Sequence, residues 1–428
     1  MAARPAILGG TPVRAGKSWP SWPQWDGSER ERLQAVLDSG TWCSAYGGEV
    51  ASFVEEFTAF QGARHGIAVT NGTHALEAAL CACGVGPGDE VIVPAMTFVA
   101  TATAVMTAGA TPVIADVEPE SCCLDPAAVA SAITDRTRAV VAVHLSGRAC
   151  DLDALTSLCG ERGIALVEDC AQSHGTRWRG RGTGTIGDAG AFSFQQSKLI
   201  TAGEGGMVTT EDDELFERAW SYANLGRIRS REWYFHAVHG TNLRMTEWQG
   251  AVLRAQLARL PDQQRRREES GTLLDTELEK IPGVTPQSGD ERMDSRARWG
   301  YGIHYDPSQF SGLSRDGFEA ALGREEIALG FRLPSLHELE LFKQGQQAPN
   351  GAAATRSYPL GSLPNAEQVT ANTVWLDQRV LLAEPEDVLD VVAAIARIRD
   401  SAGAVKLRTG KTVRAAARVA KAALRRSR

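Results

Sequence analysis

Seven short apolar runs between residues 67 and 209 are the feature that most constrains the fold of this chain. Each is three to five residues long, the length of a single buried strand, and up to the sixth the runs alternate with segments of helical pattern. Strands that alternate with helices favour an α/β domain whose sheet is mainly parallel. The runs are 67–69, 91–93, 112–115, 139–143, 164–167, 190–194 and 207–209.

The second half of the chain predicts a further, smaller unit. A long stretch from Arg244 to about Ile281 is typical of a linking helix, residues 299–305 predict a strand, and residues 385–399 predict a closing amphipathic helix. We therefore expect three parts. They are a large domain with an N-terminal extension (1–250), a small C-terminal domain (251–404) and a basic tail (405–428).

Lys198 is the only lysine between residues 18 and 279, in a chain where seven of the 45 basic residues are lysines. An ammonium group can lose its proton and attack a carbonyl, whereas a guanidinium stays protonated. The run 191–194 precedes Lys198, and a glycine-rich turn and the run 207–209 follow it. The pattern predicts a nucleophile on a loop between two strands; the alternative is an accident of a small lysine count.

Asp169 follows the buried run 164–167, at the strand end where open α/β sheets bind ligands. A carboxylate there could serve as a metal ligand, a base or the partner of a ring nitrogen. His174 lies nearby, but no second histidine or carboxylate has metal-ligand spacing, so we predict no metal. A lysine for a Schiff base and an aspartate for a ring nitrogen are what pyridoxal phosphate requires.

A phosphate site is predicted where residues 66–76 read as strand, turn and helix. Asn71, Gly72 and Thr73 stand at the helix start, where free N–H groups and the positive end of the helix dipole favour a phosphate. The alternative is an ordinary helix N-cap.

Together these elements resemble the DegT/DnrJ/StrS family of pyridoxal-phosphate aminotransferases, which act on keto sugars and keto cyclitols. The resemblance extends from about Trp19 to about Leu382 and implies a fold-type I enzyme. Such an enzyme has a large domain with a seven-stranded, mainly parallel sheet and a smaller C-terminal α+β domain. The motifs are Gly-Thr-Trp at 40–42, Asn-Gly-Thr-His-Ala-Leu at 71–76, Gly-Pro-Gly-Asp-Glu-Val-Ile-Val-Pro at 86–94, Pro-Ala-Met-Thr-Phe-Val-Ala-Thr at 94–101, Glu-Asp-Cys-Ala-Gln at 168–172, the Lys198 loop, and Asn-Leu-Arg-Met-Thr-Glu-Trp-Gln at 242–249.

The resemblance assigns a role to each candidate residue. Lys198 would form the Schiff base and carry the proton, and Asp169 would pair with the pyridinium nitrogen. The implied cofactor contacts are ring stacking by Phe98, a hydrogen bond from Gln172 to the ring hydroxyl, phosphate binding by Gly72, Thr73 and Ser193, and a phosphate contact by Asn242 from the other subunit of a homodimer.

Three of these residues have a plain structural alternative. Phe98 could be ordinary core, Ser193 a strand residue that faces solvent, and Asn242 a loop cap. The interpretation of Asn242 also depends on a second subunit.

Within the family, three segments resemble inosose aminotransferases and 3-amino-5-hydroxybenzoate synthases. They are residues 9–25 with their three tryptophans, residues 195–206, and Trp-Leu-Asp-Gln-Arg at 375–379. The resemblance implies a keto cyclitol of the scyllo-inosose type, or a keto sugar, as acceptor in antibiotic biosynthesis, with glutamine or glutamate as amino donor. After His144 the chain departs from the family, because Leu-Ser-Gly-Arg-Ala replaces the familiar aromatic residue or proline.

Two other functions stay open at this point. A synthase of the aminobenzoate type would use the same Schiff base for a dehydration. A non-catalytic cofactor-binding regulator or partner subunit would use the basic tail as its contact surface, although a protein freed from catalysis need not keep both Lys198 and Asp169.

Composition indicates a cytoplasmic enzyme without a membrane span. The 428 residues are 43% hydrophobic and 23% charged, no run approaches the twenty apolar residues of a membrane helix, and the N-terminus lacks a signal-peptide core. The eight cysteines form no CxxC pair and predict reduced thiols. Residues 401–428 carry nine basic and no acidic side chains. We expect a solvated tail and no nucleic-acid partner, although an acidic partner, a membrane surface or the acidic body of the chain could also bind it.

Overall fold

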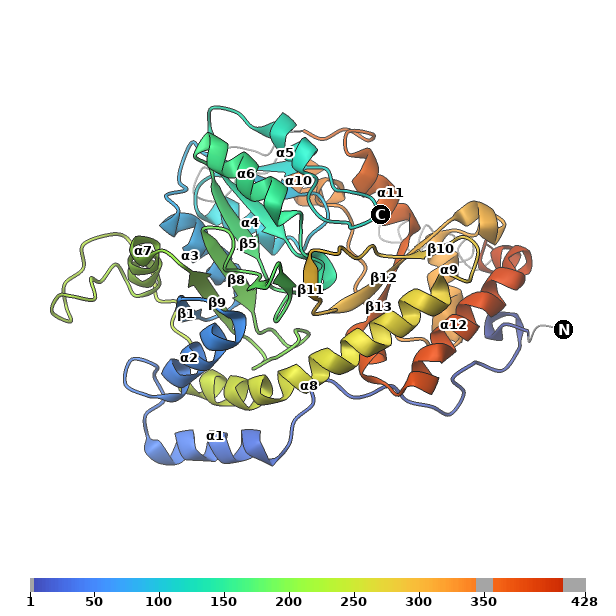
Figure 1. Cartoon of the computed structure of the whole chain (residues 1–428), viewed down its shortest axis with the longest axis horizontal. Coiled ribbons are helices and arrows are strands. Elements are labelled where there is room, and N and C mark those ends of the chain that lie inside the picture. The colour runs from blue at the N-terminus through green and yellow to red at the C-terminus, as the bar shows by residue number, and fades with distance from the viewer. Residues whose placement is uncertain (1–3, 344–356, 411–428) are drawn as a thin grey trace, which may run out of the picture.

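The large sheet has seven strands in the order β1-β9-β8-β5-β4-β2-β3 (Figure 1). In this computed structural model, which describes residues 4–343 and 357–410, β9 alone in the sheet runs opposite to its neighbours. The predicted seven-stranded, mainly parallel sheet is therefore confirmed. The strands are β1 (His65–Val69), β2 (Glu90–Pro94), β3 (Thr111–Ala115), β4 (Thr137–Val143), β5 (Ala165–Asp169), β8 (Ala189–Ser193) and β9 (Gly206–Thr210).

Helices cover both faces of this sheet, which explains why its strands are apolar along most of their length. On one face α3 packs against β8 and β9. On the other face Phe57 of α2 contacts Phe192 of β8, with ring centroids 5.0 Å apart. The helices of this half are α1 (Gly27–Ser39), α2 (Glu49–Gln61), α3 (Gly72–Ala82), α4 (Ala100–Thr107), α5 (Pro126–Ala132), α6 (Leu152–Arg162) and α7 (Asp213–Ala223).

A second, antiparallel sheet of three strands, β10-β12-β13, forms the centre of the C-terminal part. Its core contains Phe310, Phe318 and Ile395, all fully buried. A further small sheet, β11-β6-β7, joins the two parts of the chain. The elements are β6 (Arg177–Trp178), β7 (Arg181–Gly182), β10 (Val284–Pro286), β11 (Met293–Ser295), β12 (Gly300–Tyr305), β13 (Thr373–Asp377), α9 (Arg315–Arg324), α10 (Glu340–Lys343), α11 (Pro364–Asn372) and α12 (Pro385–Asp400).

The helix α8 (Glu247–Leu278) runs along both parts (Figure 1). It packs against α1 and α2, and also against α12 and the 3-10 helix η5 (Gln378–Leu382). A capping box of Thr246 and Gln249 begins it. The boundary proposed at residue 250 falls in its first turn, so the three-part division stays a proposal.

The N-terminal segment packs on the C-terminal part. The backbone N–H groups of Ala6 and Val13 each donate to the Glu325 carboxylate at 2.8 Å, and the buried Arg14 pairs with Asp387 and Asp390 at 2.9 Å. Beyond these contacts, Trp19 Nε1 donates to the carbonyl of Glu326 at 2.9 Å, and Trp22 lines a cavity together with residues of β13. Among the described residues, no helix combines the length and apolar character that crossing a membrane requires. Residues 411–428, most of the predicted basic tail, lie outside the described residues.

Candidate active site

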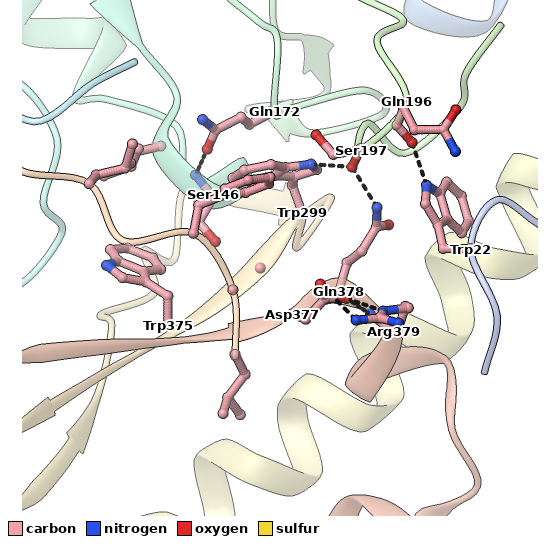
Figure 2. Close-up of a pocket in the computed structure, with 16 residues that line it drawn as sticks. Trp22, Ser146, Gln172, Gln196, Ser197, Trp299, Trp375, Asp377, Gln378 and Arg379 are labelled. Atoms are coloured by element: carbon pink, nitrogen blue, oxygen red, sulfur yellow. Dashed lines mark hydrogen bonds and ion pairs between the residues drawn. The ribbon is translucent and has the colours of Figure 1, made fainter. Parts of the chain in front are cut away.

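The loop that carries Lys198 lies between β8 and β9, and contacts from distant segments fix it. The carbonyl of Ser197 accepts hydrogen bonds from Trp299 Nε1 at 2.7 Å and from Gln378 Nε2 at 2.6 Å (Figure 2). The carbonyl of Gln196 accepts one from Trp22 Nε1 at 3.0 Å. The N-terminal segment and the C-terminal part therefore both hold the residues directly before the lysine.

The amine of Lys198 is surrounded by protein, although the residue as a whole keeps some exposure. Its Nζ lies 4.6 Å from the centroid of a Trp299 ring. Burial lowers the pKa of Lys198 to about 8, and the negative charge of Asp169 acts in the opposite direction. Near neutral pH, part of the Lys198 population thus carries a neutral, nucleophilic amine.

In protein freed of any cofactor, the acetylation rate of Lys198 by acetic anhydride should rise as the pH passes through about 8. The lowered pKa means that the reactive neutral amine already dominates above this pH, whereas exposed lysines react fully only above ~10.4. Mass spectrometry of the labelled peptides gives both profiles in one sample, with the exposed Lys280 as internal reference. Identical profiles for the two lysines would contradict the lowered pKa.

Asp169 ends β5 and is 6% exposed. Thr101 Oγ1 donates to its Oδ2 at 2.8 Å, and the N–H of Ala171 donates to its Oδ1 at 3.2 Å. Because Thr101 donates to the carboxylate, it accepts from Thr97, 2.8 Å away. Burial raises the pKa of Asp169, and the Thr101 hydrogen bond and the Lys198 charge oppose that rise. A cation brought to this carboxylate would therefore be strongly favoured.

Thr101 is a residue whose role the sequence did not reveal. It lies within the motif at 94–101, but nothing in the local pattern distinguishes it from the other threonines of α4. Only the fold, which brings residue 101 to the end of β5, shows its contact with Asp169.

Gly72 and Ser193, to which the family resemblance assigns phosphate binding, lie against each other at the start of α3. A Cβ added at Gly72 would lie 2.5 Å from the Cβ of Ser193. Ser193 is 7% exposed, so it does not face solvent. Thr73 follows in the first turn of α3, and Asn71 caps the helix by accepting from the N–H of His74 at 2.9 Å. The result is a close-fitting helix N-terminus with free N–H groups, which suits a phosphate.

His174 stabilises the position of Ser193 at this predicted phosphate site. Its Nε2 donates to the carbonyl of Ser193 at 2.9 Å, and its ring packs among Phe57, Phe192 and Phe194. Burial lowers the pKa of His174 to about 3, so the imidazole is neutral. His174 is thus a structural support of Ser193.

Replacing Gly72 by alanine should weaken binding of pyridoxal phosphate at least ~10-fold, because the new Cβ would collide with Ser193 and shift the helix start. Gly27 is the matched control: it is also the first residue of a helix, and a Cβ there meets no atom within 4 Å. Equilibrium dialysis of the two variants gives the affinities. Equal affinity in Gly72→Ala and Gly27→Ala would show that this site holds no phosphate.

The other predicted cofactor residues have distinct environments. Phe98 is 60% exposed, so it is not ordinary core. Gln172 is buried, and its Oε1 accepts from the N–H of Ser146 at 2.7 Å. Asn242 is exposed, and its Oδ1 accepts from the N–H of Arg244 at 3.3 Å, as a loop cap would. Within one chain, therefore, the Asn242 side chain is used locally.

A cavity is lined by the two residues directly before Lys198, by residues that follow β4 and β5, and by residues of β12 and β13 (Figure 2). It encloses about 780 Å³ including its open mouth. The rings of Trp299 and Phe331 stack in its wall, with centroids 5.9 Å apart. The guanidinium of Arg379 pairs with Asp377 at 2.9 Å. The aromatic lining residues are Trp22, Trp299, Phe331 and Trp375, and the uncharged polar ones are Ser146, Gln172, Gln196, Ser197 and Gln378.

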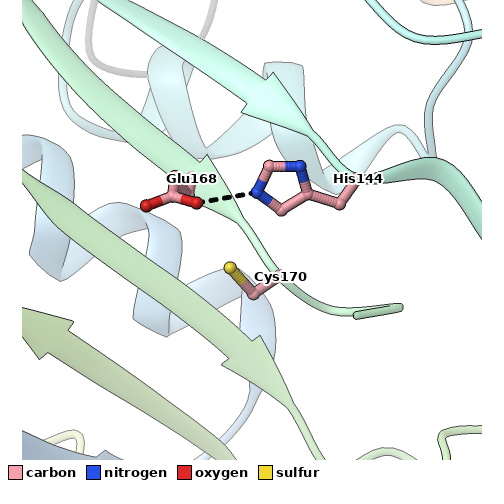
Figure 3. A group of neighbouring side chains, drawn as sticks. All are labelled: His144, Glu168 and Cys170. Carbon is pink, nitrogen blue, oxygen red and sulfur yellow. Dashed lines mark hydrogen bonds and ion pairs between the residues drawn. The ribbon is translucent and has the colours of Figure 1, made fainter. Parts of the chain in front are cut away.

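A buried group of His144, Glu168 and Cys170 has ligand atoms within 4.8 Å of one another (Figure 3). The ring nitrogens of His144 and the carboxylate oxygens of Glu168 already form hydrogen bonds within the protein. Glu168 accepts from His144 Nε2 at 2.9 Å and from two backbone N–H groups, and His144 Nδ1 accepts from the N–H of Cys150 at 3.2 Å. Burial raises the pKa of the Cys170 thiol. We interpret the group as a support for the end of β5.

Comparison with known proteins identifies the family. Residues 23–396 match the sequence model of the DegT/DnrJ/EryC1/StrS aminotransferase family. The chain belongs to this family. It is therefore an enzyme of the aminotransferase class, as the sequence motifs predicted.

Similar proteins include both kinds of relative expected from the motifs. The chain is 42% identical over 384 residues to the 3-amino-5-hydroxybenzoate synthase of Amycolatopsis mediterranei, which covers 87% of this chain and 96% of that protein. It is 37% identical over 409 residues to the L-glutamine:2-deoxy-scyllo-inosose aminotransferase of Micromonospora echinospora, with 92% and 97% covered. A crystal structure of 3-amino-5-hydroxybenzoic acid synthase superposes with a TM-score of 0.81 at 38% identity, covering 89% of this chain and 98% of that chain.

Proposed function

We propose that this enzyme is a pyridoxal-phosphate-dependent aminotransferase that moves an amino group from glutamine or glutamate to a keto cyclitol of the scyllo-inosose type, in antibiotic biosynthesis. The observation that carries the proposal is that a buried amine with a pKa of about 8, Lys198, and a buried carboxylate, Asp169, interact electrostatically close to a helix N-terminus suited to phosphate. A keto sugar is the other acceptor that the family relationship supports.

The residues present fit pyridoxal phosphate. Gly72 and Ser193 form a cradle with no room for another Cβ, which suits a phosphate held by backbone N–H groups. Phe98 offers an exposed ring face for stacking. Because Ser146 fixes the Gln172 carbonyl oxygen, the Gln172 amide nitrogen is left to donate to a ring hydroxyl. When bound, the cofactor supplies an electron sink for a carbanion.

Lys198 would transfer the proton, and Asp169 would bind the ring nitrogen. The neutral amine of Lys198 would accept a proton from the Cα of the amino donor and return it to the carbon beyond the nitrogen, C4′ of the cofactor, a task that suits a group with a pKa near the working pH. The charge of Asp169 holds a proton on the ring nitrogen. Its burial makes this pairing strong, because little water competes for the carboxylate.

The cavity favours an uncharged, hydroxylated ring over a nucleotide-linked sugar. Its aromatic walls can pack on the C–H faces of a ring, and its amide and hydroxyl groups can bind ring hydroxyls. A nucleoside diphosphate would require cationic partners. Among the described residues that line the cavity, Arg379 is the one basic side chain, and Asp377 already neutralises it.

The visible absorbance of the enzyme loaded with pyridoxal phosphate tests the proposal. Adding L-glutamine should bleach the visible band and release one 2-oxo acid per site, and 2-deoxy-scyllo-inosose should restore the band. A 42% identical relative named as a synthase favours a dehydratase as the second candidate. A band that no amino donor bleaches would support that candidate and contradict the aminotransferase.

We further propose that the enzyme is a homodimer in which Asn242 reaches the phosphate site of the other subunit. The segment 225–238 projects from the body next to α7 (Figure 1). It exposes Trp233 by 63% and Tyr234 by 79%, and Phe235 and Val238 are exposed as well. An apolar surface of this size on one segment is typical of a buried contact between subunits.

Complementation tests the role of Asn242. Lys198→Ala and Asn242→Asp subunits, each nearly inactive alone, are unfolded, mixed in equal amounts and refolded. If Asn242 serves the partner's site, each mixed dimer has one intact site, and the mixture should regain about a quarter of wild-type activity. If Asn242 serves its own site, every site carries a defect and no activity returns.

We also propose a cytoplasmic location. All eight cysteines of the chain are free thiols in the structure, as expected for a reducing compartment. The substrates proposed are small molecules, and we propose neither a nucleic-acid nor a membrane partner.

A further inference from the structure

Ser146 stands in the wall of the cavity with a hydroxyl that has no hydrogen-bond partner among the described residues. The residue is 1% exposed. A Cβ added at Gly300, another lining residue, would lie 3.2 Å from its Oγ. Figure 2 shows Ser146 between Gln172 and the ring of Trp375. Because a buried hydroxyl without a partner is unfavourable, this group is suited to a ligand.

The backbone of Ser146 is held in a conformation that residues with a side chain rarely adopt. Its φ is 59° and its ψ is 27°, in the left-handed region. Two hydrogen bonds fix the turn: the N–H of Gly147 donates to the carbonyl of His144 at 3.1 Å, and the N–H of Arg148 donates to that of Leu145 at 3.1 Å. Strained positions of this kind cluster at functional sites. This is also the turn where the sequence departs from its family.

We propose that the Ser146 hydroxyl binds a ring hydroxyl of the keto acceptor and thereby determines acceptor specificity. The proposal rests on the function proposed above. A serine hydroxyl can both donate and accept, so it suits a hydroxyl of the substrate. Among the lining residues that the structure describes, the one ion pair, Asp377 with Arg379, is internally neutral, so the ligand at Ser146 is an uncharged polyol ring.

The backbone and the side chain of Ser146 have separate roles. Its backbone N–H donates to the Oε1 of Gln172 at 2.7 Å, and its hydroxyl lies in the cavity wall beside Gly300. A Ser146→Ala substitution keeps the backbone contact with Gln172 and removes only the hydroxyl. The variant therefore separates acceptor binding from any contact with the cofactor.

The test compares Ser146→Ala with Ser221→Ala in enzyme loaded with pyridoxal phosphate. Ser221 is the matched control, since it is also buried with an unpartnered hydroxyl but lies on α7, outside the residues that line the cavity. The affinity for 2-deoxy-scyllo-inosose is read from tryptophan fluorescence, because Trp299 and Trp375 line the cavity. The half-reactions with L-glutamine and with the ketone are measured separately in single turnovers.

For Ser146→Ala we expect about tenfold weaker binding of the ketone and a matching loss of its half-reaction, with the glutamine half-reaction unchanged. Ser146→Gly, which relieves the backbone strain, should show the same loss, so impaired folding cannot explain it. Unchanged ketone affinity in both variants, or equal losses in the two half-reactions, would overturn the role of Ser146. A wild-type enzyme that neither converts L-glutamine to a 2-oxo acid nor aminates 2-deoxy-scyllo-inosose would overturn the proposed function itself.

Discussion

Lys198→Ala should abolish transamination, with a loss of about 10⁴-fold or more in kcat. A positioned proton-transfer group alone contributes up to ~10⁴-fold, and the variant also loses an amine close to Asp169 that can attack a carbonyl. Among the lysines that the structure describes, Lys198 is the one whose pKa burial lowers, to about 8. Steady-state kinetics with L-glutamine and 2-deoxy-scyllo-inosose give the loss.

Lys280→Ala is the control for this prediction, because Lys280 is exposed and pairs with Glu277 on the surface. It should keep wild-type activity. A small primary amine added to the buffer should restore part of the activity of Lys198→Ala, since it can replace the missing proton carrier. Turnover of Lys198→Ala within tenfold of wild type would show that the reaction does not pass through this amine.

Asp169→Asn should lower kcat about 10²–10³-fold, the size expected when one preorganised charge is removed from a buried site. The amide has the same shape: its oxygen can still accept from the N–H of Ala171, and its nitrogen can donate to Thr101 Oγ1, which then donates to Thr97. The loss should therefore reflect charge and not geometry. Single-turnover kinetics of the glutamine half-reaction isolate this effect from acceptor binding.

The stability of Asp169→Asn distinguishes a charge effect from damage to the fold. Burial raises the pKa of Asp169 in the folded protein. At pH values above that pKa, the buried charge of Asp169 therefore lowers the free energy of unfolding. The cofactor-free variant should thus be no less stable than wild type in thermal unfolding at neutral pH. The exposed Asp213→Asn serves as the kinetic control. A wild-type rate in Asp169→Asn would contradict the proposed partner of the ring nitrogen.

Local pattern was sufficient to predict the sheet and the position of Lys198 on a loop between two of its strands. Buried strands such as β2 are apolar over most of their length, and the glycines after Lys198 mark the turn into β9, so both features appear in short windows of sequence. The motif at 71–76 likewise combines a strand end with a helix start. Gly72 and Ser193, 121 positions apart, could be paired only through the family resemblance, and the structure brings them into contact.

Contacts between distant segments could not be predicted from local sequence pattern. Trp299 and Gln378 bind the Ser197 carbonyl across more than 100 residues, and each looks like an ordinary residue in its own segment. Ser146 was visible only as a departure from the family, because its unpartnered hydroxyl and left-handed backbone are properties of the folded chain. The same holds for the N-terminal segment, whose attachment to Glu325 depends on tertiary structure.

The most direct test of the central claim follows the nitrogen atom. The enzyme loaded with pyridoxal phosphate is incubated with 2-deoxy-scyllo-inosose and L-glutamine or L-glutamate labelled with ¹⁵N at the α-amino group, and the products are analysed by mass spectrometry. We predict ¹⁵N on the cyclitol ring and an equimolar amount of the 2-oxo acid from one of the two donors. A ring product without ¹⁵N, or a dehydrated ring with both donors unchanged, would contradict the assignment as an aminotransferase of keto cyclitols.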